Sequence, residues 1–244
     1  MSHLVWYTYS MIIETDMKTF RYILSLNSAT LLFAITLLVT GCQTGSPLKP
    51  KPTPYQPGNF SSNRTHLTPE IVTVAVMPPE VTVQLASGHE ATLKLLQQIH
   101  GTEVMKTHAF AVRLINEDML KSLVGRKSVS ANQPFPAEFF DALRENLNCQ
   151  AVLISELTAL KTMAPMKMGW HMKLIDTESL EAIWEIDEFY DAGNIHVAAA
   201  AEEYYETKLS GAFRKPDPEL VLASPRLFGQ YTLDSVLSTL PPRQ

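Results

Sequence analysis

The residues best placed to do chemistry are four polar side chains in two stretches that alternate apolar and polar positions: His171, Lys173, Glu185 and Asp187. If the stretches pair as antiparallel strands, His171 comes opposite Asp187 and Lys173 opposite Glu185, with Glu188 near them. A carboxylate that orients a histidine is typical of a general base. The alternative is a solvated sheet face with cross-strand ion pairs, each worth less than about 1 kcal/mol. We favour this alternative, as a candidate partner-binding face, because no nucleophile or oxyanion group converges on the histidine.

The strands that carry these side chains are predicted at 168–175 and 182–190, with a turn near 178–180. Pairing residues whose numbers sum to 358 also brings Leu174 opposite Trp184 on the second, apolar face. A shift of the register by one residue would set apolar side chains against charged ones. The sequence therefore specifies the register of this hairpin.

The standard catalytic and metal-binding motifs are absent from the sequence. It contains no Gly-rich phosphate loop, no G-x-S-x-G, no H-E-x-x-H and no C-x-x-C. Its histidines lack the spacing of metal ligands: His3, His66, His89, His100, His108, His171 and His196. A run of methionines could suggest a soft-metal site, but packing in the core explains it better: Met163, Met166, Met168 and Met172. We therefore expect no catalytic residue, no metal and no cofactor.

Cys42 is a second residue with definite chemistry. It ends the sequence Val39-Thr40-Gly41-Cys42, which follows an apolar stretch at 22–39 that is itself preceded by basic residues. Basic, apolar and small-residue regions in this order are typical of a signal peptide. The four residues resemble the lipobox of bacterial lipoproteins, which implies removal of 1–41 and lipid, palmitate included, on Cys42. The alternative is an uncleaved membrane anchor, since about 18 apolar residues can just cross a bilayer.

The residues around Cys42 and the net charge indicate where the protein is located and what it does not bind. Acidic residues precede Met17, so we expect translation to begin there, with Met11 as the alternative start. Removal of residues 1–41 takes away two basic and two acidic residues and leaves the net charge at -5. With no basic run, the chain is not expected to bind nucleic acid. Gln43, by resemblance to enterobacterial sorting rules, favours the outer membrane facing the periplasm over the inner membrane.

A tether and one domain follow the signal peptide. Residues 42–69 hold the lipidated cysteine and a linker with six prolines, predicted to be disordered and extended at about 3 Å per residue. Residues 70–240 form the globular domain. Cys149, without a basic neighbour, is expected to be a small buried core residue.

Within this domain, apolar periodicity and capping residues predict alternating strands and helices. The expected strands lie at 71–77, 109–115 and 151–160, besides the hairpin. The expected helices are one opened by Ser87 and Glu90 and ended by Gly101, one from Asn116 to Gly125, and others at 137–147, at 197–209 and after Ser224-Pro225. This order implies an α/β (α+β) fold, with a single mixed sheet of about five strands and helices packed on it in two or three layers.

The order of elements, together with Cys149-Gln150-Ala151-Val152-Leu153 at the entry to the strand at 151–160, resembles a group of bacterial envelope lipoproteins with an anticodon-binding-like α/β domain. The group includes the curli secretion lipoprotein, the activators of penicillin-binding proteins and the N-terminal domain of the Tol-Pal translocation protein. The resemblance implies a membrane-anchored, non-catalytic protein on the periplasmic side that binds or regulates an envelope protein complex. Open alternatives are an envelope hydrolase with an unrecognised site and a subunit of a secretion complex. A pore is not expected, because residues 161–167 are too few for a membrane-crossing hairpin.

Overall fold

The computed structural model describes residues 51–83, 89–133, 135, 137–212 and 217–243. The predicted signal peptide, Cys42, the first part of the tether and Ser87 lie outside these residues. None of the helices within the described ranges is long and apolar enough to cross a membrane.

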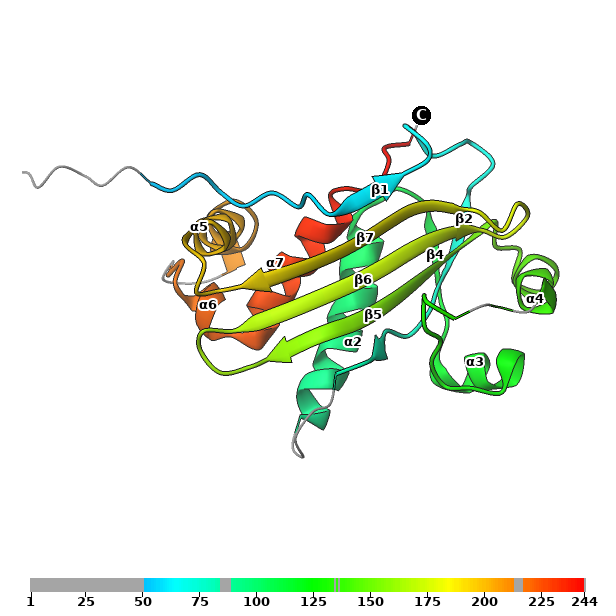
Figure 1. Ribbon diagram of the computed structural model, residues 1–244, viewed down its shortest axis with the longest axis horizontal. Coiled ribbons are helices and arrows are strands. Elements are labelled where there is room, and N and C mark those ends of the chain that lie inside the picture. Colours follow the sequence, from blue (N-terminus) through cyan, green and yellow to red (C-terminus); the bar gives the residue numbers. More distant parts are fainter. Residues whose placement is uncertain (1–50, 84–88, 134, 136, 213–216, 244) are drawn as a thin grey trace, which may run out of the picture. The chain divides into compact units, whose positions relative to one another are not determined.

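Seven strands form one mixed sheet, in the order β1-β7-β6-β5-β2-β4 with β3 paired to β5 (Figure 1). The strands are β1 (Phe60–Ser62), β2 (Thr73–Val76), β3 (Glu80–Val81), β4 (Ala111–Leu114), β5 (Ala151–Lys161), β6 (Lys167–Asp176) and β7 (Ala182–Asp191). Strand β5 is parallel to β2 and antiparallel to β6, so the sheet changes from parallel to antiparallel at its centre. The predicted single mixed sheet is confirmed, with β1 and β3 added to the expected five strands.

Helices pack against both faces of the sheet. They are α2 (Glu90–Lys106), α3 (Glu117–Val124), α4 (Ala137–Leu147), α5 (Ile195–Tyr204), α6 (Leu220–Ala223) and α7 (Pro225–Leu237). A π-helical turn, Tyr205–Leu209, continues α5. Figure 1 shows α2 and α7 behind the sheet, on what we call its back face, and α5 beside the end of β7. Helices α3 and α4 lie at one end of the other face of the sheet, which we call the front face.

The back face carries the larger hydrophobic core. Trp170 and Trp184 are almost completely buried there with Phe228 of α7. The indole N–H of Trp170 donates to the Thr232 hydroxyl at 3.0 Å, so its one polar atom is satisfied. Burial of such large aromatic side chains is the main stabilising contribution on this side.

A smaller core fills one end of the front face. Val152 and Ile154 of β5 pack there with Phe139 and Leu143 of α4. Cys149 is fully buried in this cluster, and burial raises the pKa of its thiol. The prediction of a buried, structural cysteine is therefore confirmed.

Three predicted local features are confirmed. Asn116 caps α3 by accepting the Met119 N–H at 2.8 Å, and Gly125 ends the helix with a φ of 74°. Ser224 caps α7, with Pro225 in its first turn. The β6–β7 hairpin has the predicted register throughout its polar segment, including His171 opposite Asp187.

The prediction that Gly101 ends its helix is wrong, because α2 continues to Lys106. A Cβ atom on Gly101 would lie 3.2 Å from a methyl carbon of Leu114 on β4. The glycine therefore serves the close approach of helix and strand and not helix termination.

The prediction that the linker extends to residue 69 is also wrong. Residues Phe60–Ser62 form strand β1 on the edge of β7, and Leu67 is fully buried and bridges to Arg243. Proline disfavours a central strand because it has no N–H group to donate. It is tolerated next to an edge strand, because one side of that strand has no neighbouring strand. Much of the Pro-rich segment thus belongs to the folded domain.

Candidate functional site

Side chains from three adjacent strands form a polar network in the middle of the front face. His171 of β6 lies between two carboxylates: its Nε2 is 3.0 Å from Glu185 Oε1, and its Nδ1 is 3.6 Å from Glu156 Oε2. Lys173 Nζ is 3.1 Å from the same Glu185 oxygen. Burial raises the pKa of Glu185, but the hydrogen bonds from His171 and Lys173 outweigh it and hold this pKa below its ordinary value. The network therefore favours an ionised Glu185 carboxylate, held between the Lys173 ammonium group and the His171 ring.

The geometry does not support a catalytic His171–Asp187 pair. The two residues are register partners, but the β7 carboxylate that contacts His171 is Glu185, while Asp187 is exposed. The His171 side chain is only 8% exposed, and each ring nitrogen lies within 4 Å of a carboxylate oxygen. A general base needs a nitrogen that faces its substrate. The arrangement fits an ordered ion-pair network better.

Glu156 is a member of this network that the sequence analysis missed. One of its oxygens accepts hydrogen bonds from the Ser130 hydroxyl and from the Ala131 N–H, the latter at 2.6 Å. Its other oxygen faces His171. Glu156 thus joins the sheet to the loop between α3 and α4. A signal was available, since Glu156 is the one charged residue in an otherwise uncharged, largely apolar run from 151 to 160.

Glu188 was expected near the polar network, and this expectation is wrong. Strand alternation puts Glu188 on the back face with Ile186 and Tyr190, and its side chain is buried. Its partners come from the N-terminal segment, where Tyr55 Oη donates to its carboxylate. The error arose because Glu188 is next to Asp187 in sequence, which in a strand means the opposite face.

Further along the same strands, the front face is open. Figure 1 shows no helix in front of this part of β5, β6 and β7. Phe189 is 50% exposed there, and Lys167 Nζ lies 5.8 Å from its ring centroid and 2.8 Å from Asp191. Gly169 is the register partner of Phe189 on β6, and the space that a side chain there would take is filled by Thr158, whose hydroxyl would lie 2.5 Å from an added Cβ atom. We call this set the open sheet face: Lys167, Gly169, His171, Lys173, Glu185, Asp187 and Phe189.

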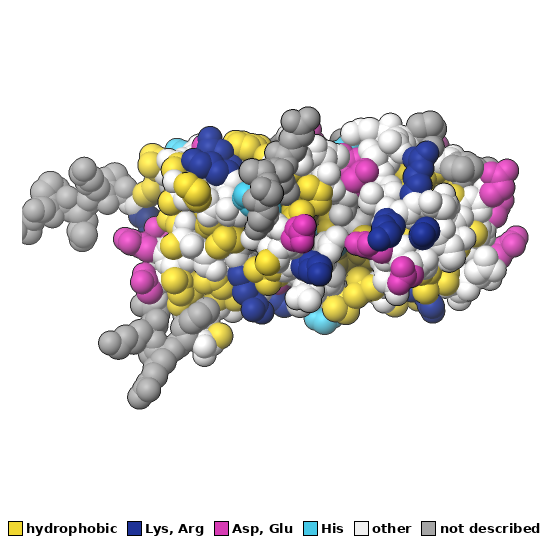
Figure 2. Space-filling model, turned by 90° about the horizontal axis from the view of Figure 1, so that it is seen from below, with side chains coloured by type: hydrophobic (Ala, Val, Ile, Leu, Met, Phe, Trp, Pro, Cys, Tyr) yellow, Lys and Arg dark blue, Asp and Glu magenta, His cyan; other side chains and the backbone are white. Residues whose placement is uncertain are grey.

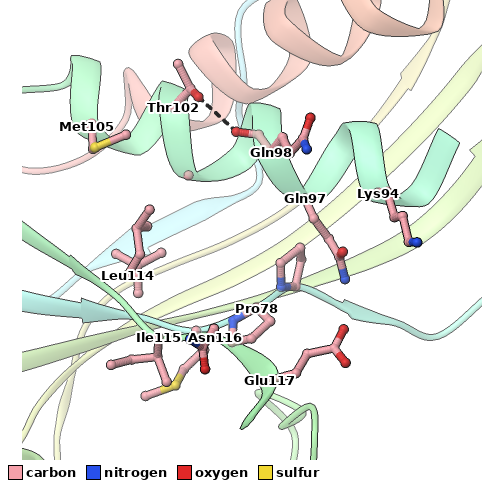
Figure 3. Close-up of a pocket in the computed structure, with 14 residues that line it drawn as sticks. Pro78, Lys94, Gln97, Gln98, Thr102, Met105, Leu114, Ile115, Asn116 and Glu117 are labelled. Carbon is pink, nitrogen blue, oxygen red and sulfur yellow. Dashed lines mark hydrogen bonds between the residues drawn. The ribbon is translucent and has the colours of Figure 1, made fainter. Parts of the chain in front are cut away.

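A second concave surface lies between α2 and the carboxyl ends of β2 and β4 (Figure 3). This groove has a volume of about 500 Å³. In Figure 3, Leu114 and Met105 form an apolar part opposite the polar side chains of Gln97 and Lys94. Leu114 is 50% exposed, as is Phe189 on the open sheet face. No sequence motif marked this groove, because its residues come from four elements: β2, α2, β4 and the start of α3.

In the part of the chain that the structure describes, no three His, Cys, Asp or Glu side chains are grouped so that they could hold a metal ion. The predicted methionine run is divided: Met166, Met168 and Met172 are buried in the back core, while Met163 is 75% exposed. Packing therefore accounts for the three buried methionines but not for Met163.

The surface charge is mixed. Figure 2 shows Lys and Arg interspersed with Asp and Glu over the face seen from below, with hydrophobic side chains between them. Surfaces that bind nucleic acid usually carry a continuous basic field. The face in Figure 2 lacks such a field.

No protein-family model matches the chain, and no curated protein matches it. Solved structures with similarity to it include PelC from Paraburkholderia phytofirmans, a dodecamer (TM-score 0.41, 14% identity, 76% of this chain and 96% of that chain). Lipoprotein GNA1162 from Neisseria meningitidis is another (TM-score 0.35, 12% identity, 57% and 99%). The LpoB C-terminal domain from Salmonella enterica is a third (TM-score 0.31, 15% identity, 50% and 83%). Of these three, GNA1162 is a lipoprotein. The similarity is distant and says nothing of a partner.

Proposed function

We propose that the chain is a lipid-anchored, non-catalytic protein of the bacterial envelope that binds an envelope protein partner through the open sheet face. The single observation that carries the binding site is Phe189, a half-exposed aromatic ring on an ordered polar surface. Aromatic side chains are enriched among the residues that dominate binding energy. Around the ring, Lys167, Asp191 and the Glu185 network supply charged groups already held in place by one another. Charged groups arranged in this way around an aromatic ring favour specificity in partner choice.

Binding explains this face better than catalysis does. The one histidine on the face is buried between carboxylates, and the nearby Ser130 hydroxyl donates to Glu156. Neither group is arranged as a nucleophile with a base that faces a substrate.

The membrane part of the proposal rests on the sequence. Lipid on Cys42 would provide the membrane affinity, since attachment through more than one acyl chain is stable. Gln43 supports placement in the outer membrane, facing the periplasm. Replacing Cys42→Ser should release the domain from the membrane fraction while its unfolding transition stays unchanged. If a chain that begins at Gln43 still pellets with membranes, the anchor assignment is wrong.

The binding surface can be tested by crosslinking and pull-down of the lipidated protein from envelope membranes. Phe189→Ala should reduce recovery of a stoichiometric envelope protein by tenfold or more, a typical loss at a central interface residue. Leu114→Ala is the matched control, because both side chains are 50% exposed and Leu114 lies in the groove. Loss of the partner in Leu114→Ala but not in Phe189→Ala would show that the groove, and not the open sheet face, is the binding site. If the unmodified protein captures no envelope protein, the proposed function is wrong.

A further inference from the structure

In the segment from Lys51 to Asn63, Phe60–Ser62 adds a strand to the edge of β7, and the residues before it have attachments of their own. Phe60 is the register partner of Ile186, and the ladder continues through Ser62 opposite Trp184. Beyond the strand, the Asp187 N–H donates to the Asn59 carbonyl at 3.0 Å. The segment thus occupies hydrogen-bonding groups that an edge strand would otherwise leave open.

Glu188 holds this segment in place. One of its carboxylate oxygens accepts the N–H groups of Gly58 and Asn59, each at 2.7 Å, and the other accepts the Tyr55 hydroxyl. The Tyr55 ring also packs edge-on against Tyr190, with centroids 5.6 Å apart. The buried carboxylate therefore receives three hydrogen bonds from one short stretch of chain. Such a charge is costly to bury without partners, so undocking the segment is strongly disfavoured.

Further contacts extend the attachment toward the predicted anchor. His196, in the first turn of α5, has Nδ1 2.7 Å from the Thr53 carbonyl, and its own carbonyl accepts the Tyr55 N–H at 3.0 Å. Lys51 Nζ lies 3.6 Å from Glu206. Contacts at residues 51, 53, 55 and 58–63 thus follow one another along the domain.

We propose that Lys51–Asn63 is a docked strap that shortens the tether and limits the domain to a zone close to the membrane. This inference rests on the proposed lipid attachment at Cys42. Between that cysteine and the strap lie eight residues, Gln43–Pro50, which span at most about 29 Å when fully extended. A tether of 27 residues would reach about three times as far. The partner must therefore present its binding site close to the surface of the membrane that holds the lipid.

Docking of the strap can be tested without lipid, by amide hydrogen exchange on the full chain. Tyr55→Ala removes the hydroxyl and the ring contact, and should speed exchange of the Asp187 amide at least tenfold. The matched control is Gln56→Ala, an adjacent exposed side chain, which should leave this rate unchanged. Slow exchange at Met172, inside the sheet, should persist in both variants and shows that they fold. Fast exchange at Asp187 in the unmodified protein would overturn the strap.

The distance between the domain and the membrane can be measured by energy transfer. The lipidated full chain is bound to vesicles whose lipid headgroups carry acceptor dyes. The donor dye is attached to Met163→Cys, at an exposed turn, and this protein should show strong energy transfer. Combining Met163→Cys with Tyr55→Ala should weaken the transfer, whereas combining it with Gln56→Ala should not. Equal transfer in all three proteins would contradict the shortened tether. If the protein fails to bind the vesicles while the Asp187 amide stays slow, the lipid anchor is wrong and the docked strap stands.

Discussion

The two faces of the sheet differ in burial and in charge. On the back face, β6 and β7 present Trp170, Met172 and Trp184, and helices exclude water from them. On the front face, the same two strands present His171 and Glu185 to a surface that helices cover at one end only. Apolar burial on one face stabilises the fold, which leaves the other face free to carry ordered charge. The difference teaches that alternate residues of one hairpin can provide apolar burial on one face and ordered charge on the other.

The largest difference between the faces should appear when an aromatic residue is truncated on each. Trp170→Ala removes a fully buried side chain and its bond to Thr232, and should lower the free energy of unfolding by about 3–5 kcal/mol. Phe189→Ala, on the front of the same sheet, should cost less than about 1 kcal/mol. Urea unfolding of both variants measures this contrast. Equal losses would mean that Phe189 is part of the core.

A second contrast concerns pH, because each face buries a histidine in different surroundings: His171 on the front face lies between carboxylates, whereas His100 on the back face contacts a hydroxyl. Burial lowers the pKa of His100 to about 4, from the ordinary 6.5, with its Nε2 2.8 Å from the Ser155 hydroxyl. The unfolded chain binds this proton at a higher pH than the folded chain. Stability should therefore be full above pH 6.5 and fall, by up to about 3 kcal/mol, as the pH drops to 4.

Urea unfolding at a series of pH values tests this dependence. His100→Gln should flatten the slope between pH 6.5 and 4, whatever its effect on absolute stability. His171→Gln, on the front face, is the comparison variant. If the slope survived in His100→Gln and disappeared in His171→Gln, the front network would be the acid-sensitive element.

Glu156 marks the boundary between the covered and the open parts of the front face. Glu156→Ala should lower stability by about 1–3 kcal/mol, because the Ala131 N–H and the Ser130 hydroxyl lose their acceptor. Proteolysis of the loop around Ser130 should speed up in parallel. Glu178→Ala, at an exposed turn, should change neither measurement. An unchanged cleavage rate in Glu156→Ala would show that the carboxylate does not anchor the loop.

The smallest effect is expected at Lys173. Its ion pair with Glu185 is partly exposed, so Lys173→Met should change stability by less than about 1 kcal/mol. The partner pull-down should be affected more than the unfolding curve. A loss of 2 kcal/mol or more in urea unfolding would place this pair among the stabilising elements.

Much of the architecture could be predicted from local signals. The β6–β7 register followed from the alternation of Met172, Leu174, Trp184 and Ile186 with charged residues, and the caps of α3 and α7 followed from Asn116 and Ser224. These features depend on neighbours in sequence or on a single strand pairing, which patterns of polarity record.

The remainder depends on contacts between distant segments. Strand β1 escaped prediction because the prolines around it indicated a linker, while Glu188, which binds the adjacent Gly58 and Asn59, lies 129 or more residues away. Similarly, the role of Gly101 is set by Leu114 on another element. Within the site, the four predicted front-face residues share one face, but the partner of His171 and the role of Glu156 required the three-dimensional arrangement.

The central claim is that the open sheet face, and not the groove, contacts an envelope partner. Site-specific photo-crosslinking in cells tests it most directly, with a photoreactive residue in place of Asp187 on the open sheet face or of Met105 in the groove. We expect a discrete crosslinked envelope protein from position 187 and none from position 105. A crosslink from position 105 alone, or none from position 187, would contradict the claim.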